Sequence, residues 1–222
     1  MKELICGIDE AGRGPVIGPL VIAGITIRDV NVFDEMGVKD SKKLTSKKRE
    51  MLSQLILQNI INHEVLFIKA TDIDDMRKVM TLNEIEVYAF SKIIKKLQPT
   101  RCYVDAADVN ADRFGQDIAK SLSHPPEIIS KHGADDIYPV VSAASIIAKT
   151  HRDREVKHIE GLLQKRINLP MGSGYPADPI TQRFLSAWVK KYHRLPPHTR
   201  KSWKTAKHIL EQQTRKTLDD FP

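Results

Sequence analysis

Apolar and polar residues alternate in blocks along this chain, and the apolar blocks have the lengths of strands. Two runs near the start, "ELICGID" and "LVIAGITI", are separated by a glycine- and proline-rich break. The second run is rich in β-branched residues, so the pair indicates two paired strands. Three later runs, residues 63–70, 101–106 and 127–130, are also short and apolar. The pattern therefore predicts five strands.

Helical periodicity follows and separates the later strands. Ile85, Ala89 and Ile93 recur every four residues, and a similar stripe runs through residues 51–56. Helices are predicted over residues 45–60, 81–97, 112–122, 141–163, 179–192 and 202–214. Strands that alternate with helices predict an α/β fold with a mixed sheet. The stretch "NLPMGSGYPADP" is the best candidate boundary, dividing the chain into a domain of residues 1–170 and a helical extension of residues 171–222.

Composition narrows the class of protein. Of 222 residues, 28% are charged and 41% are hydrophobic, as in a globular protein, and no apolar run approaches the ~20 residues of a membrane span. We therefore expect a cytoplasmic protein with no membrane partner. The net charge of +7 favours polyanionic ligands. Residues 190–216 hold many of the basic residues together with two aromatic residues, which fits either a solvated helical face or a nucleic-acid-binding surface.

Four acids stand at places where catalysis is common. Asp9 and Glu10 end the first predicted strand, Asp105 ends a central strand, and Asp135 lies between a strand and the long helix. Carboxylates packed together repel each other unless a cation lies between them, and Mg²⁺ or Mn²⁺ prefers such oxygen ligands. Two such ions would activate a water molecule and stabilise a leaving oxygen of a phosphodiester. The acids therefore predict a metal site.

The turn after the first strand sets one condition on that site. Successive residues of a strand face opposite ways, so Asp9 and Glu10 can share a site only if Glu10 already lies in the turn. A dinucleotide-binding turn is excluded, because that fingerprint needs a sixth-position glycine where this chain has Ile17. His132 is the histidine closest to the acids, and we interpret it as a loop residue.

Several motifs together resemble those of the type 2 ribonucleases H (ribonuclease HII) of archaeal type. They are "GIDEAGRGPVIGPLVIAG", "DSKKL", "YVDA", "ADDIYPVVSAASIIAKTHRDR", "GSGYP" and "TRKSWKT", and they span residues 4 to about 205 in family order. The resemblance implies a ribonuclease H-like mixed five-stranded sheet flanked by helices, with a C-terminal helical substrate-binding extension. It also implies a monomer.

The resemblance further implies an activity and its residues. The enzyme would hydrolyse the RNA strand of RNA/DNA hybrids and cut 5′ of single ribonucleotides in duplex DNA, leaving 3′-hydroxyl and 5′-phosphate ends. The catalytic, metal-binding residues would be Asp9, Glu10, Asp105 and Asp135. The substrate-binding residues would be Gly12, Arg13 and Gly14, whose backbone reads the 2′-hydroxyl, Tyr175, which packs on the adjoining sugar, and Lys39, Ser41, Lys42, Lys149 and Arg152, which contact phosphates.

Two other functions remain open at this point, and the cysteines allow a further expectation. A metal-dependent nuclease of another specificity, such as a junction resolvase, would share the carboxylates, and a noncatalytic nucleic-acid-binding protein would need only the basic tail. Cys6 and Cys102 each lie three residues before an acid. If Asp9 and Asp105 end adjacent parallel strands in step, the two cysteines should be neighbours on the other face of the sheet.

Overall fold

The computed structural model describes residues 3–38 and 44–219 of the chain. Its contacts divide the chain into two compact units. Unit 1 comprises residues 1–11, 21–67 and 80–152, and unit 2 comprises residues 12–20, 68–79 and 153–222. The expected contacts of Lys39, Ser41 and Lys42 fall outside the described residues.

Unit 1 is built on a mixed sheet of five strands in the order β3-β2-β1-β4-β5. The strands are β1 (Ile5–Ala11), β2 (Leu20–Ile27), β3 (Asn62–Ile68), β4 (Arg101–Asp105) and β5 (Glu127–Lys131). β1 pairs antiparallel with β2 and parallel with β4, and β4 pairs parallel with β5. The mixed sheet that the pattern and the resemblance implied is therefore confirmed.

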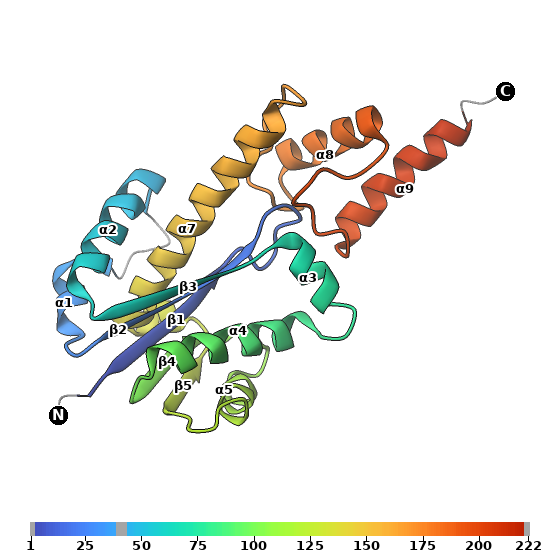
Figure 1. The fold of residues 1–222 in the computed structure, drawn as a ribbon. Helices are drawn as coiled ribbons and strands as arrows, with labels where there is room; N and C mark the ends of the chain where they lie inside the picture. Colours follow the sequence, from blue (N-terminus) through green and yellow to red (C-terminus); the bar gives the residue numbers. More distant parts are fainter. Residues whose placement is uncertain (1–2, 39–43, 220–222) are drawn as a thin grey trace. The chain divides into compact units, whose positions relative to one another are not determined.

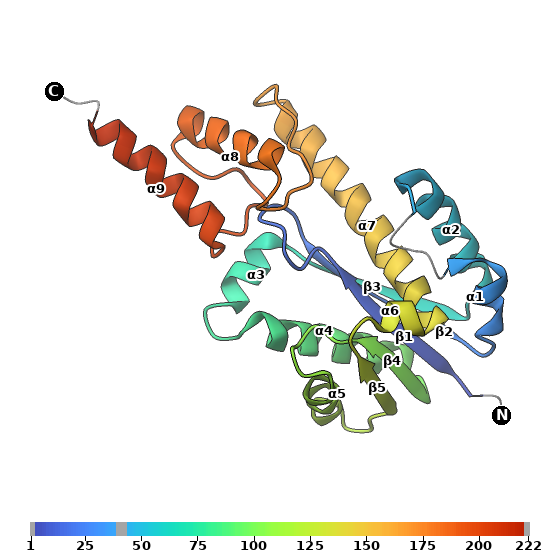
Figure 2. The ribbon, with the colours of Figure 1, turned by 180° about the vertical axis from the view of Figure 1, so that it is seen from behind.

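Helices cover both faces of this sheet (Figures 1 and 2). One face carries α1 (Asn31–Glu35), α2 (Ser46–Asn59) and residues 139–152 of α7 (Pro139–Gln164), and the other carries α4 (Leu82–Leu97) and α5 (Ala111–Lys120). A Cβ atom on Gly7 would overlap the backbone of Val140, so α7 lies directly on the strand. A Cβ atom on Gly24 would overlap the side chain of Ile93, so α4 is as close on the other face.

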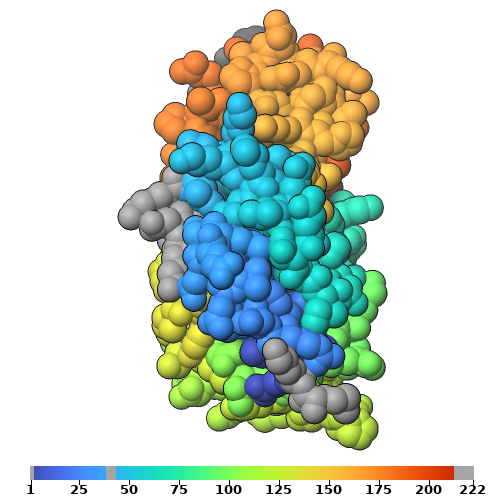
Figure 3. Space-filling view, turned by 90° about the vertical axis from the view of Figure 1, so that its left-hand side faces the viewer, coloured from blue at the N-terminus to red at the C-terminus, as the bar shows by residue number. Residues whose placement is uncertain are grey.

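The α7 face of the sheet holds a hydrophobic core of unit 1. Ala23, Ile25 and Ile27 of β2 pack there with Phe33, Ile56 and the apolar start of α7. In the space-filling view of Figure 3, α1 and α2 form the blue and cyan surface over this side. Short α6 (Ala134–Ile137) connects β5 to α7.

Unit 2 is helical and has a core of its own. It contains α3 (Ala70–Met76), α7 from Asp153 onward, α8 (Pro179–Tyr192) and α9 (Lys204–Asp219). Its core joins Val16 and Ile17 to Ile159, Phe184 and Trp188. The packing thus divides the chain at other places than the expected boundary between residues 170 and 171. A glycine- and proline-rich loop marks a change in local composition, whereas the apolar stripe of α7 continues into the second core.

The long helices agree with the predicted ones. Thr45 and Thr81 cap α2 and α4, each accepting a hydrogen bond from a backbone N–H in the first turn. The strand predicted over residues 63–70 ends at Ile68, where α3 follows. The short helices α1, α3 and α6 were not predicted, because four to seven residues carry too little periodicity. Within the described residues, no helix is both long and apolar enough to cross a membrane.

Candidate active site

Asp9 and Asp105 lie side by side at one end of the sheet in unit 1. Ile8 and Val104 are register partners on the parallel strands β1 and β4, and each precedes one of the two acids. Asp9 is 4% exposed and Asp105 is half-buried. The register therefore brings together two carboxylates that are almost one hundred residues apart in the chain.

Asp135 reaches the same end of the sheet through α6. The Oδ1 atom of Asp105 accepts a hydrogen bond from the backbone N–H of Ala134 at 2.9 Å. Asp135 follows in the first turn of the helix and is 5% exposed, whereas its neighbour Asp136 is exposed. Burial therefore distinguishes Asp135 from Asp136.

Glu10 does not meet the condition that the sequence set for it. The condition was that Glu10 lies in the turn, but β1 continues through Ala11 and Glu10 pairs with Ile22 within it. The positive φ angle comes only at Gly12, at 84°. Because Cβ directions alternate along a strand, Glu10 leaves β1 on the side opposite to Asp9. Glu10 therefore does not lie in a turn, and its role as a metal ligand stays a prediction.

The surroundings of Asp9 explain its electrostatics. The pKa of Asp9 is raised from 3.8 to about 7, chiefly by burial and also by the charge of Asp105. A hydrogen bond with Ser145, the charge of Lys149 and the backbone N–H of Glu10, which donates at 2.7 Å, all lower it. Burial is the largest of these effects, so the carboxylate is costly to ionise without a cation.

Ser145 and Lys149 reach Asp9 from one face of α7. They are four residues apart, and Lys149 Nζ donates to Ser145 Oγ at 2.6 Å. The structure thus places Lys149 at the carboxylates, and contact with a substrate phosphate stays a prediction for it. Arg152 is buried, with 8% exposed, and its predicted phosphate contact is likewise untested. Ser145 was missed because one small polar residue in an apolar helix carries no signal by itself.

Asp9, Asp105 and Asp135 have the donor chemistry that suits a hard divalent cation. A buried acid with a raised pKa beside a second carboxylate gains from a positive charge, and carboxylate oxygens are the ligands of Mg²⁺ and Mn²⁺. In residues 3–38 and 44–219, no group of three or more Asp, Glu, His or Cys side chains stands in an arrangement that could hold a metal ion. Mg²⁺ commonly takes one or two protein carboxylates and keeps several waters, so the residues fit such an ion.

A second group of candidate residues lies in unit 2. Residues 12–14, here called the glycine turn, are held next to the "GSGYP" loop, because Gly174 O accepts from Val16 N at 2.7 Å and Ile17 N at 3.2 Å. A Cβ atom built on Gly14 would lie 3.6 Å from the ring of Tyr175, which is 41% exposed. The two motifs that the resemblance linked to the sugar are therefore neighbours.

Asp178 and Thr181, at the start of α8, shape the "GSGYP" loop. Asp178 accepts from the backbone N–H and the hydroxyl of Ser173, both at 2.7 Å, and these bonds lower the pKa of Asp178 to about 2. Thr181 Oγ1 donates to Met171 O at 2.9 Å and accepts from Gly174 N at 3.0 Å. Neither residue was singled out from the sequence, where "ADPIT" indicates only a helix start.

Arg200 is a further candidate residue that the sequence analysis missed. Its fully buried guanidinium donates to the backbone carbonyls of Gly12, Arg13 and Gly18. The motif "TRKSWKT" had been noted, but one arginine among many basic residues looks like a surface charge. Only the fold shows that this one is buried.

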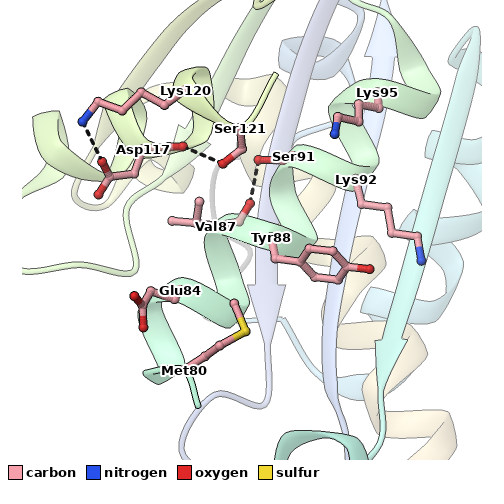
Figure 4. A pocket seen from close by; sticks show the side chains of 10 residues that line it. All are labelled: Met80, Glu84, Val87, Tyr88, Ser91, Lys92, Lys95, Asp117, Lys120 and Ser121. Carbon is pink, nitrogen blue, oxygen red and sulfur yellow. Dashed lines mark hydrogen bonds and ion pairs between the residues drawn. The ribbon is translucent and has the colours of Figure 1, made fainter. Parts of the chain in front are cut away.

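Unit 1 also contains a pocket away from the strand ends that carry Asp9 and Asp105. A cavity of about 700 Å³ opens between α4 and α5, with Tyr88 and Lys92 on one side and Lys120, which bonds Asp117 at 3.1 Å, on the other (Figure 4). It contains none of the predicted site residues. His132 bonds the backbone of Val109 through Nε2 at 3.2 Å, which agrees with its interpretation as a loop residue.

Comparison with known proteins identifies the family. The family model described as ribonuclease HII matches residues 6–206. Ribonuclease HII of Methanosarcina barkeri is 48% identical over 219 residues, covering 94% of this chain and 96% of the relative. The structure of ribonuclease H2 from Pyrococcus horikoshii aligns with a TM-score of 0.87 at 40% identity, covering 96% of this chain and 99% of that one. The ribonuclease HII of Archaeoglobus fulgidus, solved in complex with PCNA, aligns with a TM-score of 0.82 at 38% identity, covering 90% and 95%.

Proposed function

Because this chain belongs to the ribonuclease HII family, and is therefore a metal-dependent endonuclease of RNA/DNA hybrids, we propose that it also cuts 5′ of single ribonucleotides in duplex DNA. The products would carry 3′-hydroxyl and 5′-phosphate ends. Family membership sets aside the noncatalytic alternative. The specificity for ribonucleotides, the residues that carry it and the choice of metal are the proposed parts.

The position of Asp9, Asp105 and Asp135 at the same end of the sheet supports the catalytic part of the proposal. These three side chains would hold Mg²⁺ or Mn²⁺, with Glu10 as the predicted fourth ligand. When bound, such ions activate a water molecule and stabilise the leaving oxygen of a phosphodiester. Ser145 and Lys149 would orient the Asp9 carboxylate, because Ser145 shares a hydrogen bond with it and Lys149 bonds Ser145 and adds its charge.

The glycine turn and Tyr175 carry the specificity. Glycines let backbone groups approach a sugar closely, and the 2′-hydroxyl is the atom group that distinguishes RNA from DNA. The exposed ring of Tyr175 beside Gly14 offers a flat surface for the adjoining sugar. The phosphate contacts would come from Lys39, Ser41, Lys42, Lys149 and Arg152.

Three matched substrates test this function. The first is a DNA duplex with one ribonucleotide, the second is the same duplex in all-DNA form, and the third is a four-way DNA junction. We expect cleavage of the first alone, with the cut 5′ of the ribonucleotide. Equal cleavage of the first two substrates would overturn the proposed recognition of the 2′-hydroxyl. Preferred cleavage of the junction would favour the resolvase alternative.

The location and partners of the protein are proposed in the same way. The cytoplasm and a monomeric state stay predictions. Since the Archaeoglobus fulgidus relative was solved with PCNA, we propose PCNA as a partner of this chain as well. Size-exclusion chromatography of the chain alone and with PCNA tests both points, because a monomer elutes near 25.2 kDa and a complex elutes earlier.

A further inference from the structure

The three carbonyl groups of the glycine turn all bond to two side chains from the C-terminal part of unit 2. Arg200 Nη2 donates to Gly12 O at 2.5 Å, and Arg200 Nη1 donates to Arg13 O at 2.7 Å. Trp203 Nε1 donates to Gly14 O at 3.2 Å. Successive carbonyls of an ordinary extended segment point in alternate directions, so this convergence requires a particular turn, with Gly12 at a φ of 84°.

Arg200 is itself held firmly. It is 0% exposed, its Nε donates to Gly18 O at 3.1 Å, and its backbone N–H donates to Val16 O at 2.8 Å. The guanidinium lies 4.9 Å from the centre of the Trp203 ring, within the range of a cation–π contact. A buried guanidinium needs partners for its donors, and the backbone of residues 12–18 supplies three of them. Arg200 and this backbone segment therefore fix each other.

The carbonyl bonds determine where the amides of the turn point. No peptide bond among the described residues is cis, and in a trans peptide the C=O and the following N–H point in opposite directions. The N–H groups of Arg13 and Gly14 therefore point away from Arg200. The third peptide group, between Gly14 and Pro15, contributes no donor because Pro15 has no N–H. The turn thus directs two adjacent N–H donors to the side opposite Arg200. The side chain of Tyr175 packs against Gly14.

We propose that Arg200 and Trp203 are positioning residues for recognition of the ribose 2′-hydroxyl. They hold the N–H groups of Arg13 and Gly14 as a fixed pair of donors for the hydroxyl oxygen, which a deoxyribose lacks. The cation on the carbonyl side also polarises the two peptide groups and strengthens their N–H donors. This inference rests on the proposed function, in which the glycine turn reads the sugar.

Three variants separate positioning from general stability. R200K keeps the positive charge but loses the planar fork that reaches three carbonyls. W203F keeps an aromatic ring beside Arg200 but loses the indole donor to Gly14. W188F is the matched control, because Trp188 is a buried tryptophan of the same unit whose indole N–H has no hydrogen-bond partner among the described residues.

The measurements are kcat and KM on the duplex with one ribonucleotide, the Kd for the all-DNA duplex, the Kd for Mn²⁺ and the melting temperature. Loss of the turn's geometry should lower kcat/KM of R200K about 100-fold, mainly through kcat. Loss of one hydrogen bond should lower that of W203F about tenfold. W188F should stay within about twofold of the wild type, while its melting temperature falls as much as that of W203F. The Kd for all-DNA duplex and for Mn²⁺ should be unchanged in all three.

Each result decides one question. If W203F and R200K cleave the ribonucleotide duplex as well as W188F does, the positioning role is overturned. The same follows if their loss is matched by an equal loss of all-DNA or Mn²⁺ binding, since the defect would then be general. If R200K does not fold, the comparison of cleavage by W203F and W188F still tests the positioning role. If the wild type itself does not prefer the ribonucleotide duplex, the proposed function fails instead.

Discussion

Asp9 and Asp105 follow register partners on neighbouring parallel strands, and the charge of Asp105 raises the pKa of the buried Asp9. Two carboxylates in this arrangement are unfavourable without a proton or a cation between them. Without a metal, the two neighbouring carboxylates therefore destabilise the folded protein by an amount that depends on pH.

Replacing Asp9 with Asn should stabilise the metal-free protein at high pH. The folded pKa of Asp9, about 7, lies above its unfolded value near 3.8, so the native state binds the extra proton between these values. Its contribution to stability is complete below pH 3.8 and is lost as pH rises through 7. At pH 8 in EDTA, Asp9→Asn should raise the free energy of unfolding by about 2–4 kcal/mol, and at pH 4 by much less. Urea unfolding at the two pH values checks this, and a less stable variant at pH 8 would contradict it.

Adding Mn²⁺ or Mg²⁺ should raise the melting temperature of the wild type. A ligand that binds only the folded state stabilises it by mass action, and deprotonated Asp9 is the form that binds a cation. The rise should therefore be larger at pH 8 than at pH 5 and should vanish when Asp9 and Asp105 are both replaced with Asn. Chelation of the metal should abolish cleavage of hybrids. An equal rise in the double variant would place the metal elsewhere.

Asp135 and Asp136 should differ sharply in their effect on cleavage. Asp135 is buried beside Asp105, whereas Asp136 is exposed. Asp135→Asn should lower the single-turnover cleavage rate by about 100-fold or more, the scale of losing one group that stabilises the transition state. Asp136→Asn is the matched control and should stay within about threefold. Similar losses in both variants would argue against the assignment.

Asp178 should matter for both stability and sugar recognition. It caps α8 and holds the "GSGYP" loop, so Asp178→Ala should cost about 1 kcal/mol of stability and lower cleavage of the ribonucleotide duplex. Because the pKa of Asp178 is lowered to about 2, its stabilising effect is present above pH 3.8 and is lost as pH falls through 2. Thr81→Ala removes a comparable cap in unit 1 and should lower stability alone. Equal kinetic losses in the two variants would refute the loop's role.

Cys6 and Cys102 should be unreactive in the folded protein. They are register partners on β1 and β4, both are free and fully buried, and burial raises the pKa of Cys102. The expected proximity of the two cysteines is thus confirmed. Thiolates are the reactive form, so neither should react with a thiol reagent until the protein is unfolded, and reducing agents should leave cleavage unchanged. Rapid labelling of native protein would show that this face of the sheet opens.

Local patterns predicted the elements whose signals are local. The strand before Asp9, the helices capped by Thr45 and Thr81, and the candidate acids at strand ends all came from alternation, periodicity and capping residues. The ordered motifs predicted the family. Short helices such as α6 were missed, and a turn at Glu10 was left open because no local signal shows that β1 continues to Ala11.

Only the tertiary structure decided which of these residues meet. Strand register brings Asp105 to Asp9. The buried core of unit 2 includes residues from the C-terminal part of α7, which the expected domain boundary had assigned to the other domain. Burial separates Arg200 from the other basic residues of the C-terminal part whose side chains the structure describes, although their sequence context is alike. The sequence by itself determined the kinds of chemistry available and the family. Register, burial and long-range hydrogen bonds depend on residues far apart in the chain, so they decided the arrangement of the site.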